Sequence, residues 1–221
     1  MADRWATFDC YGTLIDWHGG IRTELERLFG TGDADRLVER YHELEPQVQA
    51  EDPSRSYREV LTLTTIRLAQ SEALSIPEGE TNALAESLPS WRPFPEVRDA
   101  LEEVRHRGWS LAILSNTDSD LLAASRAQLG VPFHESVAAS EIDSYKPGHR
   151  HWEEFFARTG ADRERHVHVG ASLFHDIAPA TELGLRSVWI NRLGEQADPE
   201  PTRELRDLER LPETLDELVP P

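Results

Sequence analysis

Short, mostly apolar runs alternate with amphipathic stretches along most of the chain. The apolar runs predict buried strands at 4–8, 109–114, 136–139, 166–169 and 186–190. The stretches between them have the spacing of helices and end near a glycine, at 96–107, 118–128, 148–158 and 176–183. Strands that alternate with helices indicate βαβ units, and therefore a parallel sheet covered on both faces. Residues 202–218 are expected to form one or two terminal helices.

Residues 15–91 depart from this alternation, because their apolar positions recur only at helical spacing. The clearest series has intervals of four, three and four residues, as in Leu37, Tyr41, Leu44 and Val48. A stiff, proline-containing linker at 91–95 then leads the chain back. The predicted fold class is α/β: a Rossmann-like, doubly wound parallel sheet of residues 1–14 and 92–221, with an α-helical domain of residues 15–91 inserted after the first strand.

The composition narrows the classes of partner. The formal net charge is −18, and such a surface repels a phosphate backbone, so nucleic acid is not expected as a partner. No apolar run is long enough to span a membrane, and a cytoplasmic location is the expectation. The single cysteine, Cys10, excludes an internal disulfide framework. Lys146 is the one lysine among 23 basic residues, which favours a position that requires a compact ammonium group.

Four polar clusters follow the predicted strands. They contain an aspartate, a Ser-Asn pair, a lysine and a second aspartate: residues 9–13, Ser115 with Asn116, Lys146, and residues 170–172 with Asp176. Each cluster alone is also typical of a turn or of the start of a helix. The carboxyl ends of parallel strands meet at one edge of a sheet, where ligands bind in open α/β folds. The clusters together therefore predict one cleft.

These motifs resemble those of the haloacid dehalogenase superfamily of hydrolases. The resemblance covers nearly the whole chain: a nucleophile motif at 9–14, a Ser/Thr motif at Ser115, a lysine motif at Lys146 and an acidic motif that ends at Asp176. It implies that residues 15–91 form the helical cap that such proteins place after their first strand.

Two positions differ from the phosphatases of that superfamily. Those enzymes carry an acid/base aspartate two residues after the nucleophile, and they hold Mg²⁺ with carboxylates of the first and last motifs. Here the corresponding positions are Tyr11 and Ala171, so a carboxylate that a hard cation requires is missing. Asp-x-Tyr-Gly-Thr-Leu is instead similar to the metal-independent 2-haloacid dehalogenases. Neither a metal nor another cofactor is expected.

The resemblance implies a reaction in two displacements. Asp9 attacks the carbon that bears the halogen and forms an ester, which water then hydrolyses to a 2-hydroxy acid. Lys146 would keep Asp9 ionised and correctly aimed, and Asp176 would orient or activate the water. Thr13 and Ser115 would bind carboxylate oxygens of the nucleophile or of the substrate. The implied substrate is a short halogenated carboxylic acid.

The leaving halide requires a cationic or donating surrounding. Relatives supply an arginine from a cap helix that reads roughly Arg-x-x-x-Leu-Glu, and Arg40 matches this spacing. Asn116 is expected as a second halide contact, and Tyr11 as part of the substrate site. The alternative is that Arg40 lies on a solvated helix face beside Glu39 and Glu43.

The last motif departs from that of the family dehalogenases. They usually carry an aromatic residue before the last aspartate, where this chain has His175. As a hypothesis, His175 makes the halide pocket smaller and more polar, so that fluoride is accepted as well as chloride; the alternative is that it only packs or bonds a backbone carbonyl. Ser172 is expected to replace the side chain that binds the water.

Other interpretations remain open at this point. One is a Mg²⁺-dependent phosphatase or phosphonate-type hydrolase of the same superfamily, and another is a catalytically idle member that binds a small anion or a partner protein. Relatives are often dimers, so a homodimer is also considered. Among the remaining histidines, His166 and His168 are expected to be structural or at the surface, and His149 and His151 to be exposed at a helix start. Halogen, chain length and stereochemistry stay undetermined.

Overall fold

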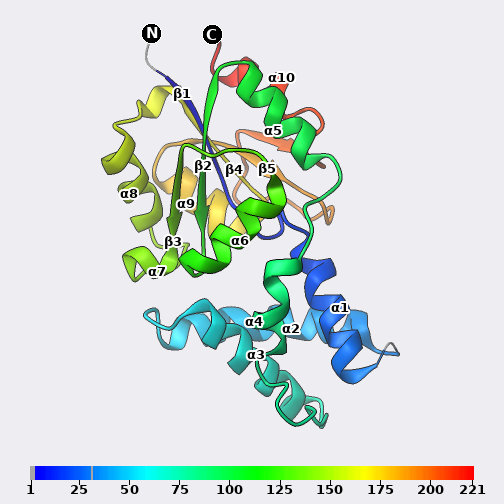
Figure 1. The fold of residues 1–221 in the computed structure, drawn as a ribbon. Helices are drawn as coiled ribbons and strands as arrows, with labels where there is room; N and C mark the ends of the chain where they lie inside the picture. The colour runs from blue at the N-terminus through cyan, green and yellow to red at the C-terminus, as the bar shows by residue number, and fades with distance from the viewer. Residues whose placement is uncertain (1–2, 31) are drawn as a thin grey trace.

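The structure, a computed structural model, describes residues 3–30 and 32–221, with a sheet-based core above a group of helices (Figure 1). The described residues form one parallel sheet of six strands in the order β3-β2-β1-β4-β5-β6. The strands are β1(Arg4–Phe8), β2(Trp109–Ser115), β3(Glu135–Ala138), β4(His166–Gly170), β5(Arg186–Ile190) and β6(Arg203–Leu205). The predicted doubly wound α/β class is confirmed.

Helices cover both faces of this sheet. Alternate residues of β2 belong to different apolar clusters, since successive strand residues point to opposite faces. Leu111 and Ile113 belong with residues of α5(Val97–His106), α6(Ser119–Leu129) and α10(Leu211–Leu218). Ala112 and Leu114 belong with residues of α7(Ala139–Ile142), α8(Arg150–Thr159) and α9(Ala178–Glu182). The near-continuous apolar pattern of β2 follows from this two-sided burial.

The C-terminal segment differs from its prediction. Residues 202–218 were expected to be helical, but only α10(Leu211–Leu218) is a helix, and β6 lies before it in the same segment. Arg203, Glu204 and Leu205 pair in parallel with Val188–Ile190 of β5. A segment of only three residues, two of them charged, is too short to show the alternation of a strand. It forms an edge strand because the backbone N–H and C=O groups of β5 would otherwise be exposed on that side.

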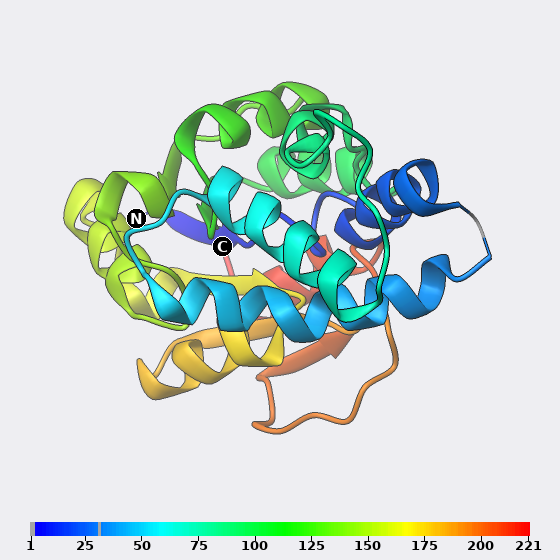
Figure 2. The same cartoon turned by 90° about the horizontal axis from the view of Figure 1, so that it is seen from below.

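The insertion after β1 is helical, as expected. Its helices are α1(Trp17–Phe29), α2(Ala34–Glu51), α3(Tyr57–Ser71) and α4(Ala83–Ser87), followed by the 3₁₀ turn η1(Leu88–Ser90). Seen from below, α2 and α3 lie across the core (Figure 2). We refer to α1–α4 and η1 as the cap. No described helix is both long and apolar enough to cross a membrane.

The first turn of α3 anchors the cap to the core. The carboxylate of Asp118 accepts hydrogen bonds from the backbone N–H groups of Tyr57 (2.9 Å) and Arg58 (3.0 Å). A carboxylate at this place satisfies helix N–H groups that have no partner within the helix. The Tyr145 hydroxyl donates to the carbonyl of Arg55 (2.7 Å) from the core side. These bonds hold the cap over the carboxyl ends of the strands.

Candidate active site

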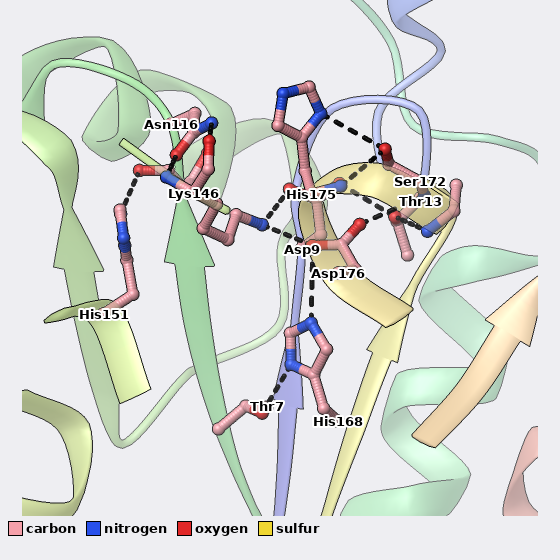
Figure 3. A network of polar contacts seen from close by, with 12 residues as sticks. Thr7, Asp9, Thr13, Asn116, Lys146, His151, His168, Ser172, His175 and Asp176 are labelled. Carbon is pink, nitrogen blue, oxygen red and sulfur yellow. Dashed lines mark hydrogen bonds and ion pairs between the residues drawn. The ribbon is translucent and has the colours of Figure 1, made fainter. Parts of the chain in front are cut away.

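Asp9 lies immediately after β1, at the edge of the sheet that faces the cap (Figure 3). Its backbone N–H still donates to the carbonyl of Val169 (2.9 Å), so the position of Asp9 is fixed by the strand pairing. The chain then turns at Gly12, whose φ of 90° lies in the left-handed region that favours glycine. This turn brings back Thr13, whose hydroxyl donates to Asp9 Oδ2 (2.9 Å) and accepts from the N–H of Ala171 (2.9 Å).

Lys146 bridges two carboxylates. Its Nζ donates to Asp9 Oδ1 (2.8 Å) and to Asp176 Oδ1 (2.6 Å), and the residue is 1% exposed. The Asn116 side chain fixes the backbone of Lys146, because Nδ2 donates to its carbonyl (2.9 Å) and Oδ1 accepts from its N–H (2.6 Å). The loops after four different strands thus meet around one ammonium group (Figure 3).

Charge and burial oppose each other in this triad of Asp9, Lys146 and Asp176. Burial raises the pKa of Asp9 to about 6, against the pull of the Lys146 ammonium. Burial opposes the charge on Lys146, but Asp176 and Asp9 outweigh it and raise the pKa of the amine. Burial also opposes the charge on Asp176, but Lys146 and His168 together lower the pKa of this carboxyl. At neutral pH all three groups are therefore charged, and Asp9 is available as a carboxylate.

A cavity of about 590 Å³ adjoins the triad. Asp9, Lys146 and Asp176 line it from the core, and residues of α1 and α2 line it from the cap. Ser115 also lines it, and its Oγ is buried with no hydrogen-bond partner among the described residues. A buried hydroxyl without a partner costs free energy, so Ser115 Oγ is suited to bind an oxygen of a ligand.

Ser172 and His175 line the same cavity beside Asp176. The Ser172 N–H donates to Asp176 Oδ2 (3.1 Å), and Ser172 Oγ accepts from the His175 N–H (3.0 Å) and lies 3.2 Å from His175 Nδ1. Burial lowers the pKa of His175 to about 4, so its ring is neutral at pH 7. Either the Ser172 hydroxyl or Nδ1 can be the donor of this contact; where Ser172 donates, the ring hydrogen is carried by Nε2.

Tyr11 lines the cavity as well, in contact with the cap. Its hydroxyl lies 2.9 Å from Ser125 Oγ, and its ring stacks on Tyr57 of α3 with centroids 6.2 Å apart. The acid/base position of a phosphatase is therefore occupied here by an aromatic wall between core and cap.

The structure does not bring Arg40 to the cavity. Its side chain is 38% exposed and pairs with Glu43 (2.5 Å) on the outer side of α2. His42 of the same helix lines the cavity. Two residues along a helix turn the side chain by about 200°, so Arg40 and His42 face opposite sides. Arg40 matches the spacing of the motif but lies on a solvated face, as the alternative interpretation stated.

Two histidines support the site from below. His151 was predicted to be exposed, but it is fully buried and its Nε2 donates to the carbonyl of Ser115 (3.1 Å). His168 is also fully buried, with Nε2 3.4 Å from Asp176 Oδ1 and Nδ1 2.9 Å from the Thr7 hydroxyl. Because the Asp176 carboxylate only accepts, His168 Nε2 carries the hydrogen. The sequence signal for this contact was weak: a histidine eight residues before the last aspartate.

Sequence reasoning also missed the cap residues of the cavity. His42, Glu45 and Gln49 line it from α2, and His18 from α1. The three residues of α2 recur at i, i+3 and i+7, which is the spacing of one helix face. This polar spacing can be read from the sequence, but the helix was predicted from the apolar series at 37–48, which lies on a neighbouring face.

The residues at the triad do not fit a Mg²⁺ site. Only Asp9 and Asp176 bring carboxylates, and each already accepts a hydrogen bond from Lys146 Nζ. Ala171, where a further ligand would stand, has no oxygen in its side chain. Mg²⁺ requires near-octahedral oxygen ligands and binds poorly beside a fixed ammonium group. Among the described residues, no group of three or more His, Cys, Asp or Glu side chains is arranged to hold a metal ion.

Comparisons with known proteins identify the family. The family model described as haloacid dehalogenase-like hydrolase matches residues 4–184. Haloacetate dehalogenase H-2 of Moraxella sp. is 29% identical over 198 residues, 85% of each chain. Glyceraldehyde 3-phosphate phosphatase of Methanothermobacter thermautotrophicus is 28% identical over 83% of this chain and 84% of that protein. The crystal structure of an L-2-haloacid dehalogenase has a TM-score of 0.87 and 21% identity, and covers 98% of this chain and 100% of that chain.

Proposed function

Since the chain belongs to the haloacid dehalogenase-like hydrolases, we propose that it removes halide from 2-haloalkanoic acids by hydrolysis, through an ester on Asp9. The observation that carries the proposal is the buried triad, in which one ammonium lies 2.8 Å from Asp9 and 2.6 Å from Asp176. Similarity to a haloacetate dehalogenase supports the choice of reaction. Fluoride is included among the halides as part of the proposal.

In the first step, a carboxylate oxygen of Asp9 bonds to the carbon that bears the halogen. The carbon–halogen bond breaks, and the halide leaves with the electron pair. Lys146 keeps Asp9 ionised before the step, and Thr13 holds Oδ2 so that the carboxylate cannot rotate. The ester carries no charge, so the ammonium is left facing Asp176 alone.

In the second step, water adds to the ester carbonyl and the acyl–oxygen bond breaks. Asp176 accepts one proton from the attacking water and returns it to the alkoxide oxygen, which leaves as the hydroxyl of the 2-hydroxy acid. The second proton of the water is released to solvent, and Asp9 is again a carboxylate. His168 donates to Asp176 from below and Ser172 from the side, which fixes the carboxylate in one orientation. Ser172 lines the cavity, and its hydroxyl is assigned to the water.

The substrate carboxylate and the halide require separate contacts. Ser115 Oγ has no hydrogen-bond partner within residues 3–30 and 32–221 and is assigned to the substrate carboxylate. Asn116 Nδ2 keeps a second hydrogen besides the one given to Lys146, and it is assigned to the halide. His175 is assigned to the halide in the tautomer in which Ser172 donates to Nδ1 and Nε2 carries the hydrogen. Tyr11 forms a wall of the substrate site. Arg40 is left out because it faces away.

The experiment is halide release from fluoro-, chloro- and bromoacetate and from both enantiomers of 2-chloropropionate, each with and without EDTA. We expect release that EDTA does not change, including release from fluoroacetate. A phosphate ester with added Mg²⁺ is the parallel arm. Turnover of the ester without any halide release would replace this proposal with a phosphatase. No turnover in either arm, with ligand binding unchanged in Asp9→Asn, would leave an idle binding protein.

A further inference from the structure

The cavity is larger than a haloacetate or a 2-halopropionate requires. At about 590 Å³ it falls within the range of roughly 300–1,000 Å³ that encloses drug-sized ligands. A two- or three-carbon acid at Asp9 would leave most of this volume unused. The unused part is the side that the cap lines.

The cap side of the cavity is polar and aromatic. On α2, His42, Glu45 and Gln49 form one face toward the cavity. On α1, Trp17 stacks on His42 with ring centroids 4.6 Å apart, and its Nε1 donates to the Tyr57 hydroxyl (3.1 Å). A wall built only to exclude water from a short alkyl chain would be apolar, so these side chains indicate recognition of a polar group.

Glu45 is the centre of this wall. It is buried, and its Oε1 accepts from Gln49 Nε2 (2.8 Å), while the Tyr57 hydroxyl also bonds the carboxylate. A carboxylate has about four acceptor positions, so two or so remain for a ligand. Burial raises the pKa of Glu45 to about 7, and no cation among the described residues pairs with this carboxylate.

The charges around the cavity favour a donor over a second acid. The cap residues that line it include no lysine or arginine among the described residues. On the core side, Lys146 is shared between two carboxylates, and Arg192 pairs with Glu96 (2.7 Å). Burial lowers the pKa of His42 to about 4, so this ring is neutral at pH 7. A second carboxylate on the substrate would face Glu45 without a counter-ion.

We propose that the preferred substrate is a 2-halo acid whose carbon chain extends into the cap and ends in a hydrogen-bond donor, a hydroxyl or an ammonium group, that Glu45 accepts. Glu45 is then a specificity-determining residue. The inference rests on the proposed dehalogenation.

The test compares 2-chloro acids of two lengths that differ only at the far end. The short pair is 2-chloro-3-hydroxypropanoate and 2-chlorobutanoate. The long set is 2-chlorohexanoate with hydroxyl, ammonium, methyl or carboxylate at carbon 6. We expect kcat/KM to be roughly tenfold to hundredfold higher for a donor than for methyl in at least one set, the worth of a hydrogen bond to a charged group, and lowest for carboxylate.

Variants locate the effect. Glu45→Leu should remove the preference for both donors, and Glu45→Gln should reduce the preference for ammonium more than that for hydroxyl. The readout is the ratio of kcat/KM for the donor to kcat/KM for its methyl analogue, so a general loss of activity in either variant cancels. The matched control is Glu43→Leu on the exposed side of α2, which should leave every ratio unchanged. A donor preference that survives Glu45→Leu, or a preference for methyl or carboxylate in the wild type, overturns the inference.

Failure of the proposed reaction would look different, because chloroacetate and every other halo acid would then release no halide. In that case calorimetry with 6-amino-2-hydroxyhexanoate and 2-hydroxyheptanoate measures the same subsite by binding alone. The donor subsite is supported if 6-amino-2-hydroxyhexanoate binds more tightly than 2-hydroxyheptanoate and if Glu45→Leu abolishes this difference. Equal binding of the two ligands rejects it.

Discussion

Replacement of Lys146 by methionine isolates the charge at the centre of the site. Methionine keeps an unbranched, buried side chain of similar length but removes the ammonium that lies between Asp9 and Asp176. Two buried carboxylates then face each other with no cation between them. Each disfavours ionisation of the other, so the pKa of Asp9 must rise from its present value of about 6.

The size of the effect follows from that pKa. With a pKa of about 6, about nine-tenths of Asp9 is ionised at pH 7. A neighbouring opposite charge typically lowers a carboxyl pKa by about 1–3 units, so without Lys146 the pKa becomes about 7–9. The ionised fraction at pH 7 then falls by about twofold to a hundredfold, and kcat/KM falls with it. Loss of one partner of a buried ion pair also destabilises the fold by about 3–5 kcal/mol.

The assay is halide release from a chloro acid between pH 5 and pH 10. In the wild type, kcat/KM should rise through an apparent pKa near 6, which reports the free enzyme. In Lys146→Met this rise should move to higher pH, with partial recovery of activity near pH 9. Arg40→Met is the matched control, since it removes an exposed cation from the same protein. An acid limb that stays near pH 6 in a folded Lys146→Met variant would refute the electrostatic role of Lys146.

The remaining predictions concern Asp9 and Arg40. Asp9→Asn should abolish halide release but unfold at a higher temperature than the wild type at pH 8. The pKa of Asp9 is about 6 in the fold and 3.8 ordinarily, so the wild type loses stability as pH rises from about 4 to about 6, by up to about 3 kcal/mol in all. Thermal unfolding at pH 4, where Asp9 is protonated in the fold, should show no such gain, and a gain at pH 4 equal to that at pH 8 would contradict the assignment. Arg40→Met should change kcat/KM by less than about twofold and the free energy of unfolding by less than about 0.5 kcal/mol, because the Arg40–Glu43 pair is exposed. A tenfold loss of kcat/KM, measured by halide release, would instead bring Arg40 into the reaction.

The core of the site was predictable from sequence because a parallel sheet places residues by topology. Once the strands are identified, the residues that follow them must meet at one edge. The contact of Lys146 with Asp9 joins residues 137 positions apart, yet it required only strand order and strand ends. The family motifs strengthened this inference, since they supply the same residue types at the same ends.

Other features were not predictable because they depend on partners that sequence does not reveal. β6 is a strand only because the edge of β5 is open, and the sequence Arg-Glu-Leu has no pattern that indicates this. His151 lies in the first turn of a helix, where exposure is the usual expectation, but the helix packs this turn under Ser115. In both cases the neighbour decides the outcome, not the local sequence.

The cap shows why chemistry is easier to read from this sequence than selectivity. The carboxyl ends of parallel strands all lie at one edge of the sheet. A residue that directly follows a strand therefore lies near the site, however the side chains around it pack. A helix of the cap can face the site with any side, and a rotation of about 100° exchanges one residue for the next. The motif spacing at Arg40 fixed the place in the helix but not its orientation, and Glu45, five residues later, occupies the cavity instead. The same helix therefore carries the spacing Arg-x-x-x-Leu-Glu while a carboxylate, and not a guanidinium, lines the cavity.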